Sequence, residues 1–359
     1  MRLSDLPAIW PRLESGRSIC VDVRQAEDEA DMQDWLTMSA AELGRGIADG
    51  RIDPVALADV YLAAIDAHPE RDRIYTVVTH DRAKAEAAAA AERARLGTRR
   101  GPLDGVPVSW KDLFDTAGTA TESGSKLLAG RVPEADAEVL RCATQAGLVC
   151  LGKTHMSELA FSGLGLNPMT ATPPNINDPA AVPGGSSSGA AASVAFGLAA
   201  CGIGSDTGGS VRIPSAWNDL VGLKTTSGRV SNAGVVPLCP RFDTVGPLSR
   251  SVEDCALVLA ALEGRDTPPL EPLNLSEMRF GALQTSVFDD IRATPLAAYD
   301  DAIARLKAAG ATVEPFDAPE VAEAMPLSGI LFTSEAYGTW APDIEAQPDM
   351  MFDSIWERF

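Results

Sequence analysis

The chain has 359 residues, a formal net charge of −20, and 45% hydrophobic and 22% charged residues. These values are ordinary for a globular protein with one large domain or two smaller ones. The acidic balance argues against nucleic-acid binding as the main function, because phosphates need a basic surface. The sequence has no run of about 18 apolar residues, so we expect no membrane-spanning helix and no membrane partner.

The six cysteines include no C-x-x-C pair, and the first residues lack the uninterrupted apolar segment of a signal peptide. We therefore expect reduced, mostly buried thiols in a cytoplasmic protein. Histidine, cysteine and carboxylate residues are not clustered at metal-ligand spacings. The sequence accordingly predicts neither a metal nor another cofactor.

Residues 1–33 show no clear hydrophobic period and are interpreted as an N-terminal extension. Helices are then predicted at 37–49, 53–68, 81–96 and 135–146, and strands at 74–78, 106–110 and 148–153. This alternation predicts the α/β fold class, with one large domain at 34–359 whose core lies at 70–264. Its mixed central β-sheet is expected to be flanked by helices on both faces.

The C-terminal part of that domain, residues 275–359, begins as one β–α–β unit. A strand at 279–283, a helix at 294–309 and a strand at 311–316 are expected to complete the same sheet. Before them, a helix at 251–264 is predicted to bury Val252, Cys255, Val258, Leu259 and Leu262. The sequence ends as if inside a helix, so we expect this part to be truncated.

The stretch from residue 182 to residue 226 carries the strongest chemical signal. Two glycine–serine turns, at 184–189 and 207–210, flank small apolar residues that predict a buried helix followed by a strand. A flexible linker would not need that apolar run. The sequence does not match the phosphate-binding loop motifs. Thr207 stands where a dinucleotide fingerprint has its last glycine, and no G-x-x-x-x-G-K-[ST] occurs. A less regular anion-binding nest stays open.

An enzymatic interpretation explains more of this stretch. Ser210 follows two glycines, and the amides of Gly208, Gly209 and Ser210 could converge on a developing oxyanion. A serine nucleophile also needs a base. Among the three histidines only His155, at a strand-to-helix junction, is kept as an alternative base.

Lys111 is the other candidate base. It ends the predicted strand at 106–110, where burial could keep its amine neutral, since desolvation lowers the pKa of lysine. An ion pair with Asp112 or Asp104 would explain a buried lysine equally well. The residues alone leave both interpretations open.

Longer motifs carry a family resemblance. The segments GGSSSG, GSDTGGSVRIPS and GLKTT, together with PLDGVPVSWKDLFDTAGTATESGS and GKTHMSEL, closely resemble the amidase signature family. The match runs from about residue 36 to residue 264 and is weaker beyond. This motif is much longer and more specific than a lone G-x-S-x-G. Within it, His155 and the loop at 171–175 depart from the usual family residues.

The resemblance implies a Ser–Ser–Lys triad that works without histidine. By motif position, Ser210 is similar to the acyl-forming nucleophile, Ser186 to the relay serine and Lys111 to the base. The family pattern also implies a cis peptide bond between Gly185 and Ser186.

The same resemblance implies supporting roles for the neighbouring residues. The oxyanion hole is expected at the backbone of Thr207, Gly208, Gly209 and Ser210. Ser187 and Asp206 are expected to fix the turns, and Arg212 is interpreted as structural.

The function implied is hydrolysis of a small carboxamide through a serine acyl-enzyme, with a small-molecule amide as substrate and a homodimer as one possible assembly. One alternative is an amidotransferase A-subunit, which uses the same triad but passes ammonia to an acceptor on a partner. Another is a catalytically silent binding or assembly protein. The pocket residues are expected near Phe161, Leu164 and the loop at 163–181.

Overall fold

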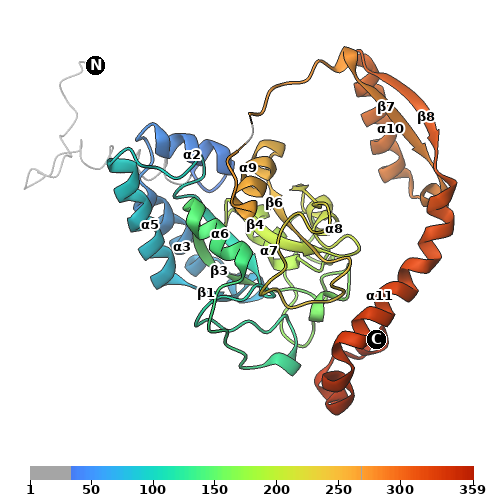
Figure 1. Cartoon of the computed structure of the whole chain (residues 1–359), viewed down its shortest axis with the longest axis horizontal. Helices are drawn as coiled ribbons and strands as arrows, with labels where there is room; N and C mark the ends of the chain where they lie inside the picture. Colours follow the sequence, from blue (N-terminus) through green and yellow to red (C-terminus); the bar gives the residue numbers. More distant parts are fainter. Residues whose placement is uncertain (1–33, 268) are drawn as a thin grey trace, which may run out of the picture.

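A mixed six-stranded sheet forms the centre of the molecule (Figure 1). The computed structural model describes residues 34–267 and 269–359, so the expected extension at 1–33 lies outside the described residues. The strands run in the order β1-β3-β2-β4-β6-β5. They are β1 (Tyr75–Val78), β2 (Pro107–Lys111), β3 (Val149–Thr154), β4 (Cys201–Asp206), β5 (Val221–Gly222) and β6 (Thr244–Ser249). β2 pairs in parallel with β3 and β4, whereas the other pairs are antiparallel, which confirms the mixed sheet.

Helices pack around this sheet. They are α2 (Ala40–Ala48), α3 (Pro54–Ala67), α4 (Arg71–Ile74), α5 (His80–Arg95), α6 (Glu138–Ala146), α7 (Ser188–Ala195), α8 (Arg212–Trp217) and α9 (Val252–Glu263). The predicted start of α3 is confirmed, because the Asp53 carboxylate accepts from the amides of Val55 and Ala56 and Pro54 follows it. Gly147, in the left-handed region, ends α6 as its C-cap.

Small residues let α7 approach the sheet closely. This helix has the sequence SGAAASVA, and it lies against β2 and β4. A Cβ atom on Gly202 of β4 would sit 2.6 Å from the carbonyl oxygen of Ala190, a distance that real Cβ contacts do not reach. The buried helix and strand predicted at the centre of the sequence therefore form one tightly packed unit.

The predicted inner face of α9 needs one correction. Cys255, Val258 and Leu262 are buried as expected, but Val252 is 73% exposed. Its neighbour Asp254 is buried instead, because its carboxylate accepts from the amide of Ala41 in α2 and takes part in the capping box of α9. Hydrophobic period alone does not reveal a carboxylate that serves the N-terminal amides of two helices.

The C-terminal β–α–β unit does not join the central sheet, contrary to the sequence expectation. β7 (Arg279–Gln284) and β8 (Thr312–Asp317) pair in parallel with each other, and α10 (Ala293–Ala308) connects them. Figure 1 shows this unit apart from the six-stranded sheet. β7 and β8 form backbone hydrogen bonds with each other along one edge. A hydrophobic period does not specify which sheet edge a strand will join.

A long helix that the sequence analysis did not predict follows this unit. α11 (Pro319–Ala346) contains Pro326 and Pro342, residues that normally argue against a helix interior. Its second half packs on the central body, where Ala336 and Ile344 are buried and Trp340 Nε1 donates to the Pro237 carbonyl at 3.0 Å. Tertiary packing thus overrides the local tendency of the two prolines to interrupt a helix.

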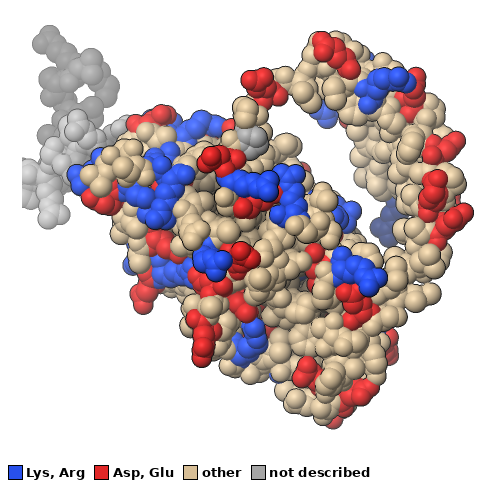
Figure 2. Space-filling view, viewed as in Figure 1, with Lys and Arg blue, Asp and Glu red and all other residues tan. Residues whose placement is uncertain are grey.

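Shorter elements complete the described chain. They are η1 (Lys126–Leu128), η2 (Glu158–Ala160), η3 (Leu275–Glu277), η4 (Ser286–Phe288), η5 (Pro348–Met350) and α12 (Asp353–Trp356). On the face shown in Figure 2, basic side chains are interspersed with acidic ones. None of the described helices is both long enough and apolar enough to cross a membrane. The five cysteines in this part of the chain are free thiols, and four of them are buried.

Candidate active site

The sheet topology brings the predicted site residues to one edge. Lys111 is the last residue of β2, and Ser205 and Asp206 end the parallel neighbour β4. Parallel strands end at the same edge of a sheet, which is where open α/β sheets place their ligands. The turn that carries Ser186 leads into the N-terminus of α7, which packs against both strands.

Lys111 is fully buried and is held by two hydroxyl groups. Its Nζ lies 2.7 Å from Ser186 Oγ and 2.8 Å from Ser205 Oγ. Burial lowers the pKa of Lys111 to about 7, against the opposing influence of the Asp243 and Asp206 carboxylates. A large fraction of this amine is therefore neutral near neutral pH.

The ion pairs that the sequence left open for Lys111 do not form. Asp112 pairs with Lys153, whose Nζ lies 3.2 Å from Asp112 Oδ1, and both side chains are buried. Asp104 binds the guanidinium group of Arg93. Each carboxylate therefore has a different cation, and the hydrogen-bond partners of Lys111 Nζ among the described residues are hydroxyl groups.

The turn before α7 holds Ser186 against the lysine. The Gly185–Ser186 peptide bond is cis, as the resemblance implied. The Gly185 amide donates to the Gly163 carbonyl at 2.8 Å, and the Ser186 carbonyl accepts from the Ser157 amide at 3.2 Å. A Cβ on Gly185 would lie 2.5 Å from the nitrogen of Gly165, so only glycine fits there.

Asp206 organises the second turn. Its buried carboxylate accepts from the amides of Gly209 at 2.8 Å and Val211 at 3.1 Å. Arg212 contributes Nε and Nη2 donors at 3.0 and 2.9 Å, and its hydrogen bonds help to keep the pKa of Asp206 low despite burial. The side chains of Asp206 and Arg212 thus occupy structural positions in the turn.

Ser187 ties the two turns together. Its amide donates to the carbonyl of Ser210 at 3.2 Å, and its hydroxyl donates to the carbonyl of Ser205 at 3.2 Å. No hydrogen bond joins Ser186 Oγ to Ser210 Oγ in the described part of the chain. Hydrogen bonds of a catalytic site are often loose before substrate binds.

The expected oxyanion hole has one amide already in use. Gly209 donates its N–H to Asp206, and its φ of +131° requires glycine. An oxyanion at Gly209 would share that amide with Asp206. Thr207, Gly208 and Ser210 line a pocket.

The pocket over Ser210 has a volume of about 200 Å³. Its lining comprises Ala160, Phe161, Ser162, Gly163, Thr207, Gly208, Ser210, Ile213, Leu238, Phe332 and Arg358. Phe161 lines it as expected, but Leu164 does not, and the loop at 163–181 contributes only Gly163. Phe332 arrives from α11, and one of its ring atoms would lie 3.2 Å from a Cβ on Gly208.

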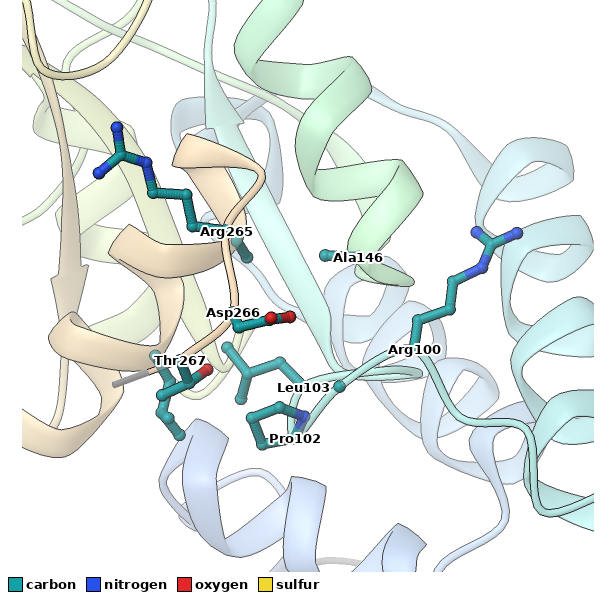
Figure 3. Close-up of a pocket in the computed structure, with 10 residues that line it drawn as sticks. Arg100, Pro102, Leu103, Ala146, Arg265, Asp266 and Thr267 are labelled. Atoms are coloured by element: carbon teal, nitrogen blue, oxygen red, sulfur yellow. The ribbon is translucent and has the colours of Figure 1, made fainter. Parts of the chain in front are cut away.

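A second hollow lies away from these residues (Figure 3). It is bordered by Pro102 and Leu103, by Ala146 at the end of α6, and by residues 265–267 after α9. Figure 3 shows the guanidinium groups of Arg100 and Arg265 on opposite sides of it. Lys111, Ser186 and Ser210 do not line it.

His155 is not placed as a base for Ser210. Burial lowers the pKa of its imidazole to about 4, and its Nδ1 has no hydrogen-bond partner among the described residues. Its backbone carbonyl instead accepts from Ser188 Oγ and from the Gly189 amide. The alternative base considered from the sequence is therefore not supported.

Three residues of the site were missed by sequence reasoning. Ser205 directly precedes Asp206 in the same motif, so its place at the end of a buried strand was a usable signal. Asp243 accepts a hydrogen bond from the Thr207 hydroxyl, yet it lies in a segment for which the sequence predicts a loop. Phe332 carried no signal, because it follows Ser210 by more than a hundred residues.

Comparison with known proteins agrees with this geometry. A family model described as Amidase matches residues 56–358. The chain belongs to the amidase signature family. As in the sequence expectation, the central domain has the mixed sheet with flanking helices that solved amidases show.

Relatives of this amidase-family chain carry several names. It is 45% identical over 225 residues to the A-subunit of glutamyl-tRNA(Gln) amidotransferase from Anaeromyxobacter dehalogenans, covering 63% of this chain and 46% of that protein. It is 41% identical over 294 residues to "2-amino-5-chloromuconic acid deaminase" of Comamonas testosteroni, covering 80% and 63%. The native peptide amidase of Stenotrophomonas maltophilia matches with a TM-score of 0.76 and 34% identity, over 87% and 68%. The chain thus spans about half to two thirds of the length of these curated relatives.

We expect Asp206→Ala to destabilise the protein by about 3 kcal/mol, because several backbone amides and Arg212 lose their shared acceptor. Urea unfolding followed by circular dichroism measures this. Asp49→Ala is a matched control, since Asp49 forms only an exposed pair with Arg51 and its loss should leave the midpoint unchanged. An unaltered midpoint for Asp206→Ala would show that Asp206 does not hold the turn.

Proposed function

We propose that the protein is an amide hydrolase that cleaves a small carboxamide through an acyl-enzyme on Ser210. The observation that carries this proposal is the buried Lys111 amine, which contacts Ser186 Oγ at 2.7 Å and has no carboxylate partner within the described chain. A buried neutral amine next to a hydroxyl group is a suitable general base. Because the chain spans only part of its relatives, their activities support this proposal by analogy.

In the first half of the proposed reaction, neutral Lys111 accepts a proton from Ser186 Oγ. Ser186 in turn accepts the proton of Ser210 Oγ, which attacks the carbonyl carbon of the amide. The carbonyl oxygen becomes an oxyanion, which the amides of Thr207, Gly208, Gly209 and Ser210 would stabilise. These are the same backbone amides that the family resemblance implied from the sequence. The Gly209 amide also donates to the Asp206 carboxylate.

In the second half, the relay runs in reverse. Ser186 donates a proton to the leaving nitrogen and recovers one from the Lys111 ammonium, so the carbon–nitrogen bond breaks and the amine departs. Water then attacks the ester on Ser210 while one of its protons passes to Ser186 and a proton passes from Ser186 to Lys111, and the relay then runs back to return a proton to Ser210 Oγ as the acid leaves. Lys111 ends neutral, so the cycle balances without an external acid or base.

The pocket favours a small and partly apolar substrate. Its volume of about 200 Å³ lies below the usual range for pockets that hold drug-sized ligands. Apolar walls come from Phe161, Ile213, Leu238 and Phe332. We therefore propose a small carboxamide with an apolar group as the substrate class.

The first test uses 4-nitrophenyl acetate and a panel of small aryl amides. We expect the wild type to release one equivalent of nitrophenol per site in a burst, and Ser210→Ala to lose at least about 10³-fold in rate. Ser186→Ala and Lys111→Ala should lose a comparable factor, because the relay acts as a unit.

Ser227→Ala serves as the matched control for these variants. Ser227 is exposed and its hydroxyl contacts only the Arg241 carbonyl, at 3.4 Å, so its loss should leave the burst intact. A burst that persists in Ser210→Ala would overturn the assignment of the nucleophile.

The pH profile tests the neutral lysine separately. The reactive form of Lys111 is the deprotonated one, and burial lowers its pKa to about 7. The rate of Ser210 acylation should therefore be constant at alkaline pH and fall roughly tenfold per pH unit below the pKa of Lys111. Stopped-flow burst rates between mildly acidic and alkaline pH measure this, and a flat profile would contradict the proposed base.

A second candidate is a component of a glutamine-dependent amidotransferase. The identity of 45% to an amidotransferase A-subunit favours it. This candidate expects glutamine hydrolysis only when partner proteins are added, whereas the hydrolase is active by itself in the cytoplasm as a monomer or homodimer. Assays of ammonia release with and without such partners distinguish them. A catalytically silent protein would give neither the burst nor covalent labelling by a fluorophosphonate.

A further inference from the structure

A small cavity is lined in part by Ser205 and does not include Ser186 in its lining. It is lined by Leu113, Ala160, Ser205, Asn232, Val235, Val236, Leu238 and Asp243. Its volume is about 10 Å³, which is room for a single water molecule. Most of its walls are apolar, and Ser205, Asn232 and Asp243 are its polar members.

Asn232 presents a free acceptor at this cavity. Its Nδ2 donates to the Asp243 carbonyl at 2.8 Å, which fixes the orientation of the amide group. Its Oδ1 is buried, and no protein group among the described residues lies within hydrogen-bonding distance. Buried acceptors are almost always satisfied, by water where no protein donor is near.

The carboxylate of Asp243 is already engaged. One oxygen accepts from the Thr207 hydroxyl, and the other accepts from the amides of Leu238 and Cys239. Asn232 Oδ1 is therefore the acceptor in the cavity wall that still lacks a donor.

Ser205 supplies the connection to the proposed base. A neutral amine has a single lone pair, and Lys111 must direct it at the Ser186 hydroxyl in order to accept its proton. Ser205 Oγ, 2.8 Å from Lys111 Nζ, must then accept an N–H from the lysine and donate its own hydrogen elsewhere. The cavity lies beside this hydroxyl.

We propose that Asn232 is a positioning residue that acts on Lys111 through Ser205 and one water molecule bound in this cavity. The water accepts the Ser205 hydrogen and donates to Asn232 Oδ1, so that Ser205 presents a lone pair to Lys111. The lysine lone pair is thereby left for Ser186. This inference rests on the proposed function, since it concerns the direction of hydrogen bonds around the same base.

Asn232→Ala removes none of the other charged side chains around Lys111. Asp243 and Asp206 are the carboxylates whose charges act on the amine, and Asp206 is neutralised by Arg212. In the buried ion pair between Lys153 and Asp112, Lys153 lies on the neighbouring strand β3 and Asp112 directly follows β2. Because Asn232 Nδ2 also donates to the Asp243 carbonyl, an effect of Asn232→Ala could pass through Asp243 as well as through Ser205, and Val236→Ile, which keeps Asn232, separates the two routes.

The test measures the rate at which a fluorophosphonate probe labels Ser210 as a function of pH. In this reaction Ser210 Oγ bonds to phosphorus, fluoride leaves, and the proton passes to the relay. We expect Asn232→Ala to slow labelling roughly tenfold at pH 7 to 9, the effect of one lost hydrogen bond. Asn274→Ala, which removes only local contacts of η3, should label at the wild-type rate.

A double-mutant cycle separates positioning from a general structural effect. Because Asn232 acts through Ser205, adding Asn232→Ala to Ser205→Ala should cause no further loss. Two losses that multiply would overturn the proposal. If Asn232→Ala fails to fold, Val236→Ile places a methyl group in the cavity and keeps Asn232, and it should give the same tenfold loss. Labelling at the wild-type rate in Val236→Ile would also overturn it.

These outcomes are distinguishable from failure of the proposed function. If the wild type is not labelled at Ser210, the serine hydrolase mechanism itself fails. If the wild type is labelled with the expected pH profile and Asn232→Ala matches it, only the role of Asn232 is wrong.

Discussion

The site depends on the burial of one lysine amine without a carboxylate partner. A charged ammonium in that environment would be costly, so the protein holds the Lys111 amine near the point of deprotonation at neutral pH. The nearby buried lysine, Lys153, shows the contrasting solution, because it keeps Asp112 as a partner. Burial lowers the pKa of both lysines, and they differ in their hydrogen-bond partners: hydroxyl groups contact Lys111, whereas a carboxylate contacts Lys153.

The surrounding structure serves to hold hydroxyl groups against that amine. Two turns carry them, and both need glycine where the backbone approaches other backbone closely or adopts a positive φ, as at Gly185 and Gly209. Asp206 shapes the second turn, and Ser187 joins it to the first. Rigid backbone hydrogen bonds, more than side-chain packing, therefore set the positions of Ser186 and Ser210.

The pocket is built from distant segments, and this separates the chemistry from the choice of substrate. Its lining includes Thr207, Gly208 and Ser210 of the second turn and residues 160–163, whereas Leu238 and Phe332 come from a later loop and from α11. Relatives with different names, an amidotransferase A-subunit and a deaminase, match this chain at 45% and 41% identity.

The sequence by itself determined the local elements and the reactive residue types. Hydrophobic period and caps predicted the strands around Lys111 and the helix–strand unit at 188–206, and the family resemblance of the long motif indicated Lys111, Ser186 and Ser210 as the candidate triad. Only the tertiary structure decided whether Lys111 pairs with Asp112, because that depends on Lys153 arriving from the parallel strand β3. It likewise decided that β7 and β8 form their own sheet, that Phe332 reaches the pocket, and that Asn232 and Ser205 line the same cavity. Contacts between residues far apart in the chain leave no periodic trace in either segment, so these features could be seen only in the folded molecule.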